Sequence, residues 1–237
     1  MEKLAIVIPV YNEQDAIGGV LQKWVKMLDE IKVHYVIFAL NDGSKDNSLE
    51  ILRNYSARFP DRIIAIDKLN SGHGPTILMG YRKAAQEGYD WVFQIDSDDE
   101  MGPEEFPVLW GKRNEFDFLV GYRKGRRQAF SRRMVSWVSR CVVRLFYGKT
   151  IWDVNTPYRL MRVSWFAKTF MSIPDQTFAP NVIISGVASR AGCRRLEIPV
   201  PQHDRVTGVV SIKKWKLLKA AFRSFVQTIL FSFKAPK

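Results

Sequence analysis

The tripeptide Asp96-Ser97-Asp98 carries the strongest chemical signal in this sequence, because it directly follows an apolar run at residues 91–95. Two carboxylates at this spacing, at the end of a strand, can serve a hard divalent cation. Mg²⁺ takes one or two carboxylates and completes its shell with waters and phosphate oxygens. A solvated acidic turn in front of a helix gives the same pattern. The spacing by itself leaves both interpretations open.

Two other polar segments follow apolar runs. In Asn41-Asp42-Gly43-Ser44, the Asp42 carboxylate can accept a hydrogen bond from a nucleobase imide or a ribose hydroxyl, although Asp-Gly-Ser is also ordinary turn chemistry. Residues 70–75 are a glycine-rich entry to a helix, where backbone N–H groups can face a phosphate. This loop lacks the lysine of a P-loop and the glycine spacing of a dinucleotide fingerprint. Its His73 suits a loop hydrogen bond better than base catalysis.

The elements that must position these residues alternate between strand and helix. Mainly apolar runs of the strand type occur at residues 4–10, 35–40, 63–66, 91–95 and 116–120, and the first of them is continuous. Helical spacing occurs at residues 15–28, 47–55 and 75–86, and a further helix is expected from Gly102-Pro103. This order predicts an α/β fold with a mostly parallel sheet and helices on both faces. Such sheets bind ligands beyond the carboxyl ends of their strands, where Asp42 and Asp96 lie.

The second half of the chain is less regular. We expect helices at residues 131–147 and 181–190, a strand at 195–200, a strand or loop at 153–160, and a loop at 201–211. Residues 212–233 have the spacing of a long amphipathic helix. The predicted organisation is one α/β domain over residues 1–211, followed by an amphipathic, membrane-associated helix within residues 212–237.

Length and composition narrow the class of protein. A chain of 237 residues with 46% hydrophobic residues suits a globular domain and excludes a disordered or fibrous chain. Two cysteines exclude a disulfide scaffold and a four-cysteine zinc site. The sequence has neither a cleavable signal pattern nor a run of about 18 uncharged apolar residues. We therefore expect a cytoplasmic protein without a membrane-spanning helix.

The net charge of +12 is divided unevenly along the chain. Residues 1–110 carry 11 basic and 18 acidic side chains, a net charge of −7, whereas residues 111–237 carry 25 basic and 6 acidic ones, a net charge of +19. The second half therefore suits an anionic partner. By charge alone this partner can be a nucleic acid, a membrane surface or a phosphorylated substrate.

Taken together, the motifs resemble the inverting glycosyltransferases of family 2, which have the GT-A fold. The resemblance extends in order from Ala5 to Ser211. It is carried by Val7-Ile8-Pro9-Val10-Tyr11-Asn12-Glu13, Asn41-Asp42-Gly43-Ser44, Asn70 to Gly80 with Ala84, Asp96-Ser97-Asp98, Gly121-Tyr122-Arg123, Asp153 to Arg162 and Ile198-Pro199-Val200.

The resemblance implies a nucleoside-diphosphate sugar as donor and Mg²⁺ or Mn²⁺ as cofactor. Asp98 would hold the metal at the diphosphate in a catalytic role, Asp96 would contact the ribose or share the metal, and Asp42 would contact the base. A divalent metal suits this reaction because it neutralises charge on the departing diphosphate. Many relatives have two acids before Gly-Ser, whereas the first is Asn41 here, so we expect base recognition to be adjusted. The other donor-binding residues implied are Pro9, Tyr11, Glu13, Gly72, His73 and Ser97.

The basic half of the chain indicates the acceptor. Transfer to a hydroxyl normally needs a general base, yet residues 176–181 contain no acid where polysaccharide-building relatives usually have a pair. A phosphate acceptor is already anionic and needs cationic partners instead. Arg123, Arg132 and Arg133 resemble the arginines that bind the lipid phosphate in dolichol-phosphate mannose synthase-like polyprenyl-phosphate glycosyltransferases. Arg205 resembles part of the loop that covers the donor diphosphate, where it would act in catalysis.

Asp153 and two helices can each be interpreted in two ways. Asp153 is either a catalytic residue or the partner of Arg159 in an ion pair. The helix at residues 131–147 and the C-terminal helix have basic and apolar faces suited to an anionic membrane surface, although core packing or a solvated face gives similar patterns. The basic face of the first helix is Arg133, Trp137, Arg140 and Arg144, and its apolar face is Met134, Val138, Cys141, Val142 and Leu145. The apolar face of the C-terminal helix is Leu218, Ala221, Phe222, Phe225 and Ile229.

The leading hypothesis is a metal-dependent inverting glycosyltransferase that moves a sugar from UDP or GDP to undecaprenyl or dolichyl phosphate. It would act at the cytoplasmic face of the membrane, to which it binds peripherally. A second enzymatic hypothesis keeps the donor site and uses a saccharide or protein hydroxyl as acceptor, with Asp153 or Asp175 as base. Two non-enzymatic hypotheses are a basic nucleic-acid-binding module and a membrane scaffold. Nucleic acid is not expected, because Asp42, Asp96 and Asp98 would repel its phosphates without a metal.

Overall fold

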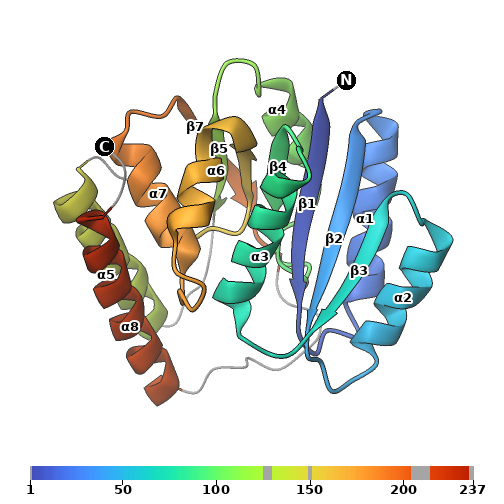
Figure 1. Cartoon of the computed structure of the whole chain (residues 1–237), viewed down its shortest axis with the longest axis horizontal. Helices are drawn as coiled ribbons and strands as arrows, with labels where there is room; N and C mark the ends of the chain where they lie inside the picture. The colour runs from blue at the N-terminus through green and yellow to red at the C-terminus, as the bar shows by residue number, and fades with distance from the viewer. Residues whose placement is uncertain (1, 125–129, 149–150, 204–213, 235–237) are drawn as a thin grey trace.

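The structure, a computed structural model, describes residues 2–124, 130–148, 151–203 and 214–234 (Figure 1). The strands are β1 (Lys3–Val10), β2 (His34–Asp42), β3 (Ile63–Lys68), β4 (Trp91–Gln94), β5 (Phe118–Lys124), β6 (Arg159–Arg162) and β7 (Arg195–Pro201). The helices are α1 (Ile17–Glu30), α2 (Ser48–Arg58), α3 (His73–Gln86), α4 (Phe106–Gly111), α5 (Phe130–Tyr147), α6 (Val163–Ser172), α7 (Pro180–Arg190) and α8 (Lys214–Ser232).

The strands form one sheet in the order β3-β2-β1-β4-β6-β5-β7. Neighbouring strands run parallel, except that β6 is antiparallel to both β4 and β5. Helical crossovers between β1, β2, β3 and β4 explain the parallel order of the first half, since parallel neighbours need a long connection. The prediction of a mostly parallel sheet is therefore confirmed.

Helices cover both faces of the sheet, as predicted (Figure 1). On one face, α1 and α4 pack over Leu4, Ile6 and Ile8 of β1, and on the other face α3, α6 and α7 pack over Ala5 and Val7. Successive residues of a strand point to opposite faces. All five side chains are fully buried, so β1 reads as a continuous apolar run instead of an alternating one.

Three elements differ from the sequence prediction. The strand expected within residues 153–160 is β6, which begins only at Arg159, and residues 153–158 are irregular. The helix expected from Gly102-Pro103 begins at Phe106 as the short helix α4. The sequence pattern does not predict α6, whose Val163, Phe166 and Phe170 are buried against the sheet.

At one end of the molecule, on the left in Figure 1, α8 packs against α5 and α7. The Tyr147 hydroxyl donates to the backbone oxygen of Thr228 at 2.9 Å, and Arg190 Nη1 donates to that of Ser232 at 2.6 Å. These bonds fix α8 to the domain through both neighbouring helices. No helix in the described ranges has the length and hydrophobicity to cross a bilayer.

The apolar faces expected for α5 and α8 are not the faces that pack against the core. Cys141, Leu145 and Phe222, which were expected on apolar faces, are exposed. The sides of the two helices that face the core carry several small polar residues, which a search for apolar stripes does not select. The buried residues on the core-facing sides, polar and apolar together, are Ser139, Val143 and Tyr147 of α5 and Ser224, Thr228 and Phe231 of α8.

Candidate active site

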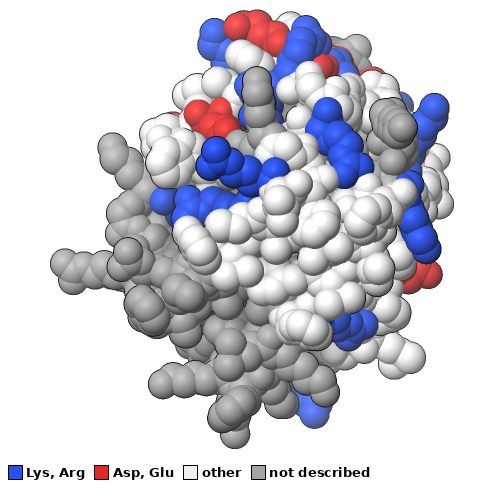
Figure 2. All heavy atoms as spheres, turned by 90° about the vertical axis from the view of Figure 1, so that its left-hand side faces the viewer, with Lys and Arg blue, Asp and Glu red and all other residues white. Residues whose placement is uncertain are grey.

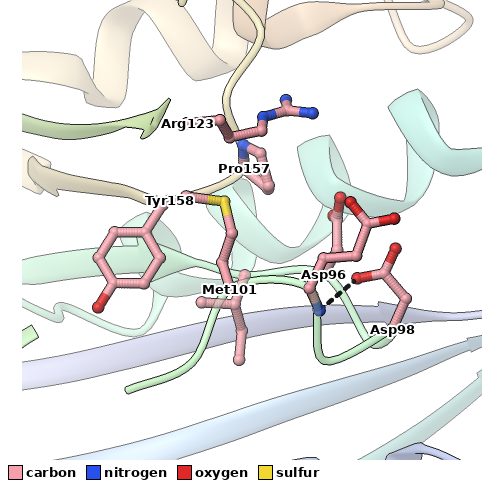
Figure 3. Close-up of a pocket in the computed structure, with 8 residues that line it drawn as sticks. Asp96, Asp98, Met101, Arg123, Pro157 and Tyr158 are labelled. Atoms are coloured by element: carbon pink, nitrogen blue, oxygen red, sulfur yellow. Dashed lines mark hydrogen bonds between the residues drawn. The ribbon is translucent and has the colours of Figure 1, made fainter. Parts of the chain in front are cut away.

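Asp96 and Asp98 lie beyond the carboxyl end of β4, at the edge of the sheet where ligands are expected. Figure 3 shows the carboxylates of both residues close together, with Arg123 from the end of β5 on the other side of a small pocket. Residues from the acidic and the basic halves of the chain therefore meet at one place. The pocket is lined by Ile95, Asp96, Asp98, Glu100, Met101, Arg123, Pro157 and Tyr158.

Asp96 is held by two donors from neighbouring elements. Its Oδ1 lies 3.0 Å from Nε2 of His73, at the start of α3, and accepts a hydrogen bond from Nε2 of Gln94 at 3.2 Å. Burial would raise the pKa of the Asp96 carboxyl, but His73 outweighs burial, so this pKa lies below its ordinary value. Asp96 is therefore ionised at neutral pH.

The imidazole of His73 interacts with the carboxylates of the site. The side chain of His73 is 54% exposed. Partial desolvation would lower the pKa of its imidazole, but the charges of Asp96, Asp98 and Asp42 outweigh this effect and raise the pKa. The structure thus brings together three of the carboxylates that the sequence predicts for donor binding. Because His73 contacts Asp96 directly, it serves here as a hydrogen-bonding partner of that carboxylate.

Asp98 and its neighbour Asp99 point in different directions. Asp98 Oδ1 accepts a hydrogen bond from the backbone nitrogen of Glu100 at 3.2 Å, drawn as a dashed line in Figure 3. Asp99 forms an ion pair with Lys23 of α1, outside the pocket. Asp99 thus supplies the solvated acidic turn, and Asp96 and Asp98 remain as the pair that faces the pocket.

The oxygen donors of Asp96 and Asp98 fit a hard divalent cation. Within the part of the chain that the structure describes, no three His, Cys, Asp or Glu side chains form a metal-binding group. Asp96 and Asp98 would hold such a cation, and phosphate oxygens and water can complete its shell. This division is typical of Mg²⁺ sites that also bind phosphates.

Arg123 and Asp153 form an ion pair beside the pocket, with Arg123 Nε 3.0 Å from Asp153 Oδ2. This Nε is buried and donates no hydrogen bond to any described residue. Of the two interpretations of Asp153, the ion pair with Arg159 is replaced in the described structure by an ion pair with Arg123. The pair holds the guanidinium of Arg123 at the border of the pocket, where it can contact an anion.

Arg159 is instead a fully buried cation at the start of β6. It donates to the backbone oxygens of Thr156 at 2.8 Å, Asn181 at 3.1 Å and Val154 at 3.3 Å. Burial lowers its pKa to about 10, so the guanidinium stays charged at neutral pH. Arg159 thereby fixes the irregular segment that carries Asp153 to the first turn of α7.

Asp42, at the end of β2, is buried among donors from the end of β3 and the loop after it. Its carboxylate forms an ion pair with Lys68 and accepts from the backbone nitrogens of Ser71 at 2.8 Å and Gly72 at 2.9 Å. Burial would raise the pKa of the Asp42 carboxyl, but Lys68 and the amide of Ser71 outweigh it, so this pKa is lowered. Asp42 therefore shapes the glycine-rich loop, and its contact with a base stays a prediction.

The loops after β1 and β2 are bonded to each other. The backbone nitrogen of Asn12 donates to Ser44 Oγ at 3.1 Å, and that of Glu13 donates to Ser48 Oγ at 2.8 Å. Of the other residues predicted to bind the donor, Tyr11 is 36% exposed after β1, whereas Pro9 lies inside β1 and Ser97 is buried. Their contacts with a donor stay predictions.

Some predicted residues lie outside what the structure describes. Arg205 falls in residues 204–213, and the side chains of Arg132 and Arg133, at the start of α5, are also outside it. Of the arginines predicted to bind the acceptor phosphate, Arg123 is the one whose side chain is described.

The sequence analysis misses several polar residues that surround the site. They are Lys68 beside Asp42, Arg159 as an anchor, and the buried group of Tyr81, Gln94 and Asn181. Gln94 had a visible signal, because it is the one polar residue in the apolar run at residues 91–95.

Comparisons with known proteins agree with this geometry. The family model described as glycosyl transferase family 2 matches residues 5–176. An undecaprenyl-phosphate 4-deoxy-4-formamido-L-arabinose transferase from Edwardsiella ictaluri is 29% identical over 92% of this chain and 66% of the relative. One from Proteus mirabilis is 27% identical over 94% of this chain and 66% of the relative. The chain thus spans just under two thirds of the length of these relatives.

Solved structures share the fold at low sequence identity. Glucosyl-3-phosphoglycerate synthase from Mycobacterium tuberculosis, in complex with Mn²⁺ and UDP-glucose, has a TM-score of 0.69 at 15% identity, covering 100% of this chain and 80% of that one. Mannosyl-3-phosphoglycerate synthase from Rubrobacter xylanophilus has a TM-score of 0.69 at 13% identity, covering 98% and 74%. The fold is the GT-A fold, and with the match of the family model over most of its length the chain belongs to glycosyl transferase family 2.

Proposed function

We propose that this glycosyltransferase moves a sugar from a UDP- or GDP-sugar to a polyprenyl phosphate at the cytoplasmic face of a membrane, with inversion at the anomeric carbon. The observation that carries the proposal is the pocket where the Asp96 and Asp98 carboxylates face the Arg123 guanidinium. A site with both charges suits a reaction in which one phosphate group leaves and another attacks.

The donor side of the site is the carboxylate pair. Asp96 and Asp98 would hold Mg²⁺ or Mn²⁺, which when bound neutralises charge on the departing nucleoside diphosphate. The solved Mycobacterium tuberculosis enzyme, described with Mn²⁺ and UDP-glucose, supports a donor of this class. His73 and Gln94 keep the Asp96 carboxylate ionised and oriented toward this role.

The acceptor side is cationic. The relatives' names contain undecaprenyl phosphate, and a phosphate oxygen is a nucleophile that needs no general base. It would attack the anomeric carbon, forming a carbon–oxygen bond to the lipid phosphate while the bond to the nucleoside diphosphate breaks. Arg123, held by Asp153, would orient this phosphate.

A membrane surface suits the outer sides of α5 and α8. Figure 2 shows a broad uncharged surface on this side of the molecule, bordered by Lys and Arg. Exposed apolar side chains recur at helical spacing on both helices, with the exposed cations Arg144 and Arg223 among them. This arrangement fits an anionic lipid surface. The exposed apolar residues are Trp137 and Leu145 of α5 and Phe222, Val226, Leu230 and Phe233 of α8 or directly after it.

The test measures transfer of label from radioactive UDP- and GDP-sugars to undecaprenyl and dolichyl phosphate, with and without Mn²⁺. We expect labelled lipid only with the divalent cation. Label on a saccharide hydroxyl, with every lipid phosphate unlabelled, would refute the acceptor and favour Asp153 as general base. Asp175 suits that role less well, because its side chain is 80% exposed and pairs with Arg82, neither of which lines the pocket.

The metal assignment is tested with Asp98→Ala and the neighbouring control Asp99→Ala. Loss of a metal ligand removes several kcal/mol of charge stabilisation, so Asp98→Ala should reduce transfer by about 100-fold or more. Asp99→Ala should keep wild-type transfer, because Asp99 binds Lys23 away from the pocket. Equal activity of the two variants would contradict the assignment of Asp98.

A further inference from the structure

A cluster of buried polar side chains lies directly behind Asp96. Tyr81 of α3, Gln94 of β4 and Asn181 of α7 are each 2% exposed or less. The Tyr81 hydroxyl lies 2.6 Å from Gln94 Oε1 and 2.9 Å from Asn181 Oδ1, and Asn181 Nδ2 donates to Gln94 Oε1 at 2.7 Å. Gln94 Nε2 then donates to Asp96 Oδ1 at 3.2 Å. The cluster therefore connects three elements to one carboxylate of the site.

Burial of this cluster costs free energy unless each of its polar groups has a hydrogen-bond partner. A buried amide or hydroxyl destabilises the folded chain when it lacks a hydrogen-bond partner, whereas an apolar side chain of similar shape would not. Around the cluster, α3 and α7 also pack with apolar residues such as Leu78, Ala84 and Ile184. Apolar side chains of similar shape at all three positions would therefore serve the stability of the core about as well.

The bonds of Gln94 determine which end of its amide faces Asp96. Oε1 lies between the Tyr81 hydroxyl and Asn181 Nδ2, both of which can donate to it. With the amide turned over, Nε2 would oppose the NH₂ group of Asn181, and Oε1 would oppose the Asp96 carboxylate. Both contacts would be repulsive. Tyr81 and Asn181 therefore keep the NH₂ group of Gln94 directed at Asp96.

Asp96 is thereby fixed through one of its two oxygens. Gln94 Nε2 and His73 Nε2 both contact Oδ1. Among the described residues, the other oxygen, Oδ2, has no such hydrogen bond, and the carboxylate lies at the pocket beside Asp98. A carboxylate held in this way presents a chosen oxygen to a ligand without having to reorganise.

We propose that Gln94, oriented by Tyr81 and Asn181, is a positioning residue that holds Asp96 for the divalent cation of the donor complex. The inference rests on the proposed function, since it assumes a metal–nucleotide complex at Asp96 and Asp98. Partners that bind a metal-ligating carboxylate typically change metal affinity by about 10- to 100-fold when they are replaced.

The test measures the Kd of Mn²⁺ in the presence of UDP by electron paramagnetic resonance, which does not depend on turnover. Gln94→Met keeps the length of the side chain and removes the donor to Asp96, so the Kd should rise about 10-fold or more. Tyr81→Phe removes only one hydroxyl and should raise the Kd by a smaller factor. Thr169→Val is the matched control, because Thr169 is a buried polar residue of α6 without a bond to the cluster, and its Kd should equal that of the wild type.

The possible outcomes separate the two proposals. Absence of Mn²⁺ binding by the wild-type protein with UDP would overturn the proposed metal-dependent donor site. Normal binding by the wild type and an unchanged Kd in Gln94→Met would overturn the positioning role and leave the donor site intact. Thermal melting shows whether each variant is folded, and if Gln94→Met does not fold, an unchanged Kd in Tyr81→Phe overturns the inference.

Discussion

Replacement of Arg159 by Met tests how the segment before β6 is held. The change removes the donors to the backbone oxygens of Thr156, Asn181 and Val154. The Val154 oxygen keeps the hydroxyl of Ser185 at 2.8 Å, so the main loss is at the other two oxygens. A buried acceptor left without its donor costs about 1–3 kcal/mol. Relief of the desolvation of the guanidinium offsets part of this cost, and we expect a net loss of about 2–4 kcal/mol of unfolding free energy.

Urea denaturation followed by tryptophan fluorescence measures this free energy. Arg159→Lys should not restore stability, because an ammonium retains the buried charge but lacks the fork that reaches divergent oxygens. Arg53→Met is the control for loss of an arginine, since the side chain of Arg53 is 66% exposed, and it should change stability by less than about 0.5 kcal/mol. A loss below about 1 kcal/mol in Arg159→Met, or wild-type stability in Arg159→Lys, would refute the reasoning.

Two further predictions concern stability in acid and the start of α3. Hydrogen bonds from Arg194 hold the pKa of the buried Asp117 below its ordinary value, so its contribution to stability is present above about pH 4 and is lost as the pH falls through the lowered pKa. Asp117→Asn should therefore have a lower unfolding free energy than the wild type at pH 7, and it should lose less of this free energy between pH 5 and pH 2 in urea titrations. An equal loss in the variant and the wild type over this pH range would contradict this prediction. A Cβ at Gly74 would lie 2.2 Å from the backbone oxygen of Phe178, so Gly74→Ala should cost about 1–3 kcal/mol in thermal melts. Gly19→Ala, where no atom lies within 4 Å of such a Cβ, should be neutral or stabilising, and equal melting of both variants would count against the close contact.

The first half of the fold follows from local patterns. Each of β1 to β4 coincides with an apolar run. For β1, β2 and β4 the reason is that both faces of the strand are largely buried, so no polar side interrupts the run. β6 is different, since it has only four residues and both ends are arginines. Arg159 points into the core and Arg162 binds Asp117, and these directions depend on strand neighbours that are distant in sequence.

The candidate site could be predicted from the sequence to about the same extent as the fold. The positions of Asp96 and Asp98 follow from the strand in front of them, and Arg123 follows from the resemblance to the family. Which site residues form ion pairs with each other could not be predicted from the sequence in the same way. Asp153 had two arginines available, and the structure pairs it with Arg123 of β5 instead of Arg159 of the neighbouring strand β6.

The antiparallel strand β6 also has a consequence for how the pocket is held together. Among the described strands, the sheet passes from the first half of the chain to the second where β4 pairs with β6. β6 pairs in turn with β5, so it lies between the strand that precedes Asp96 and Asp98 and the strand that carries Arg123. We therefore expect local opening of β6 to separate the two sides of the pocket.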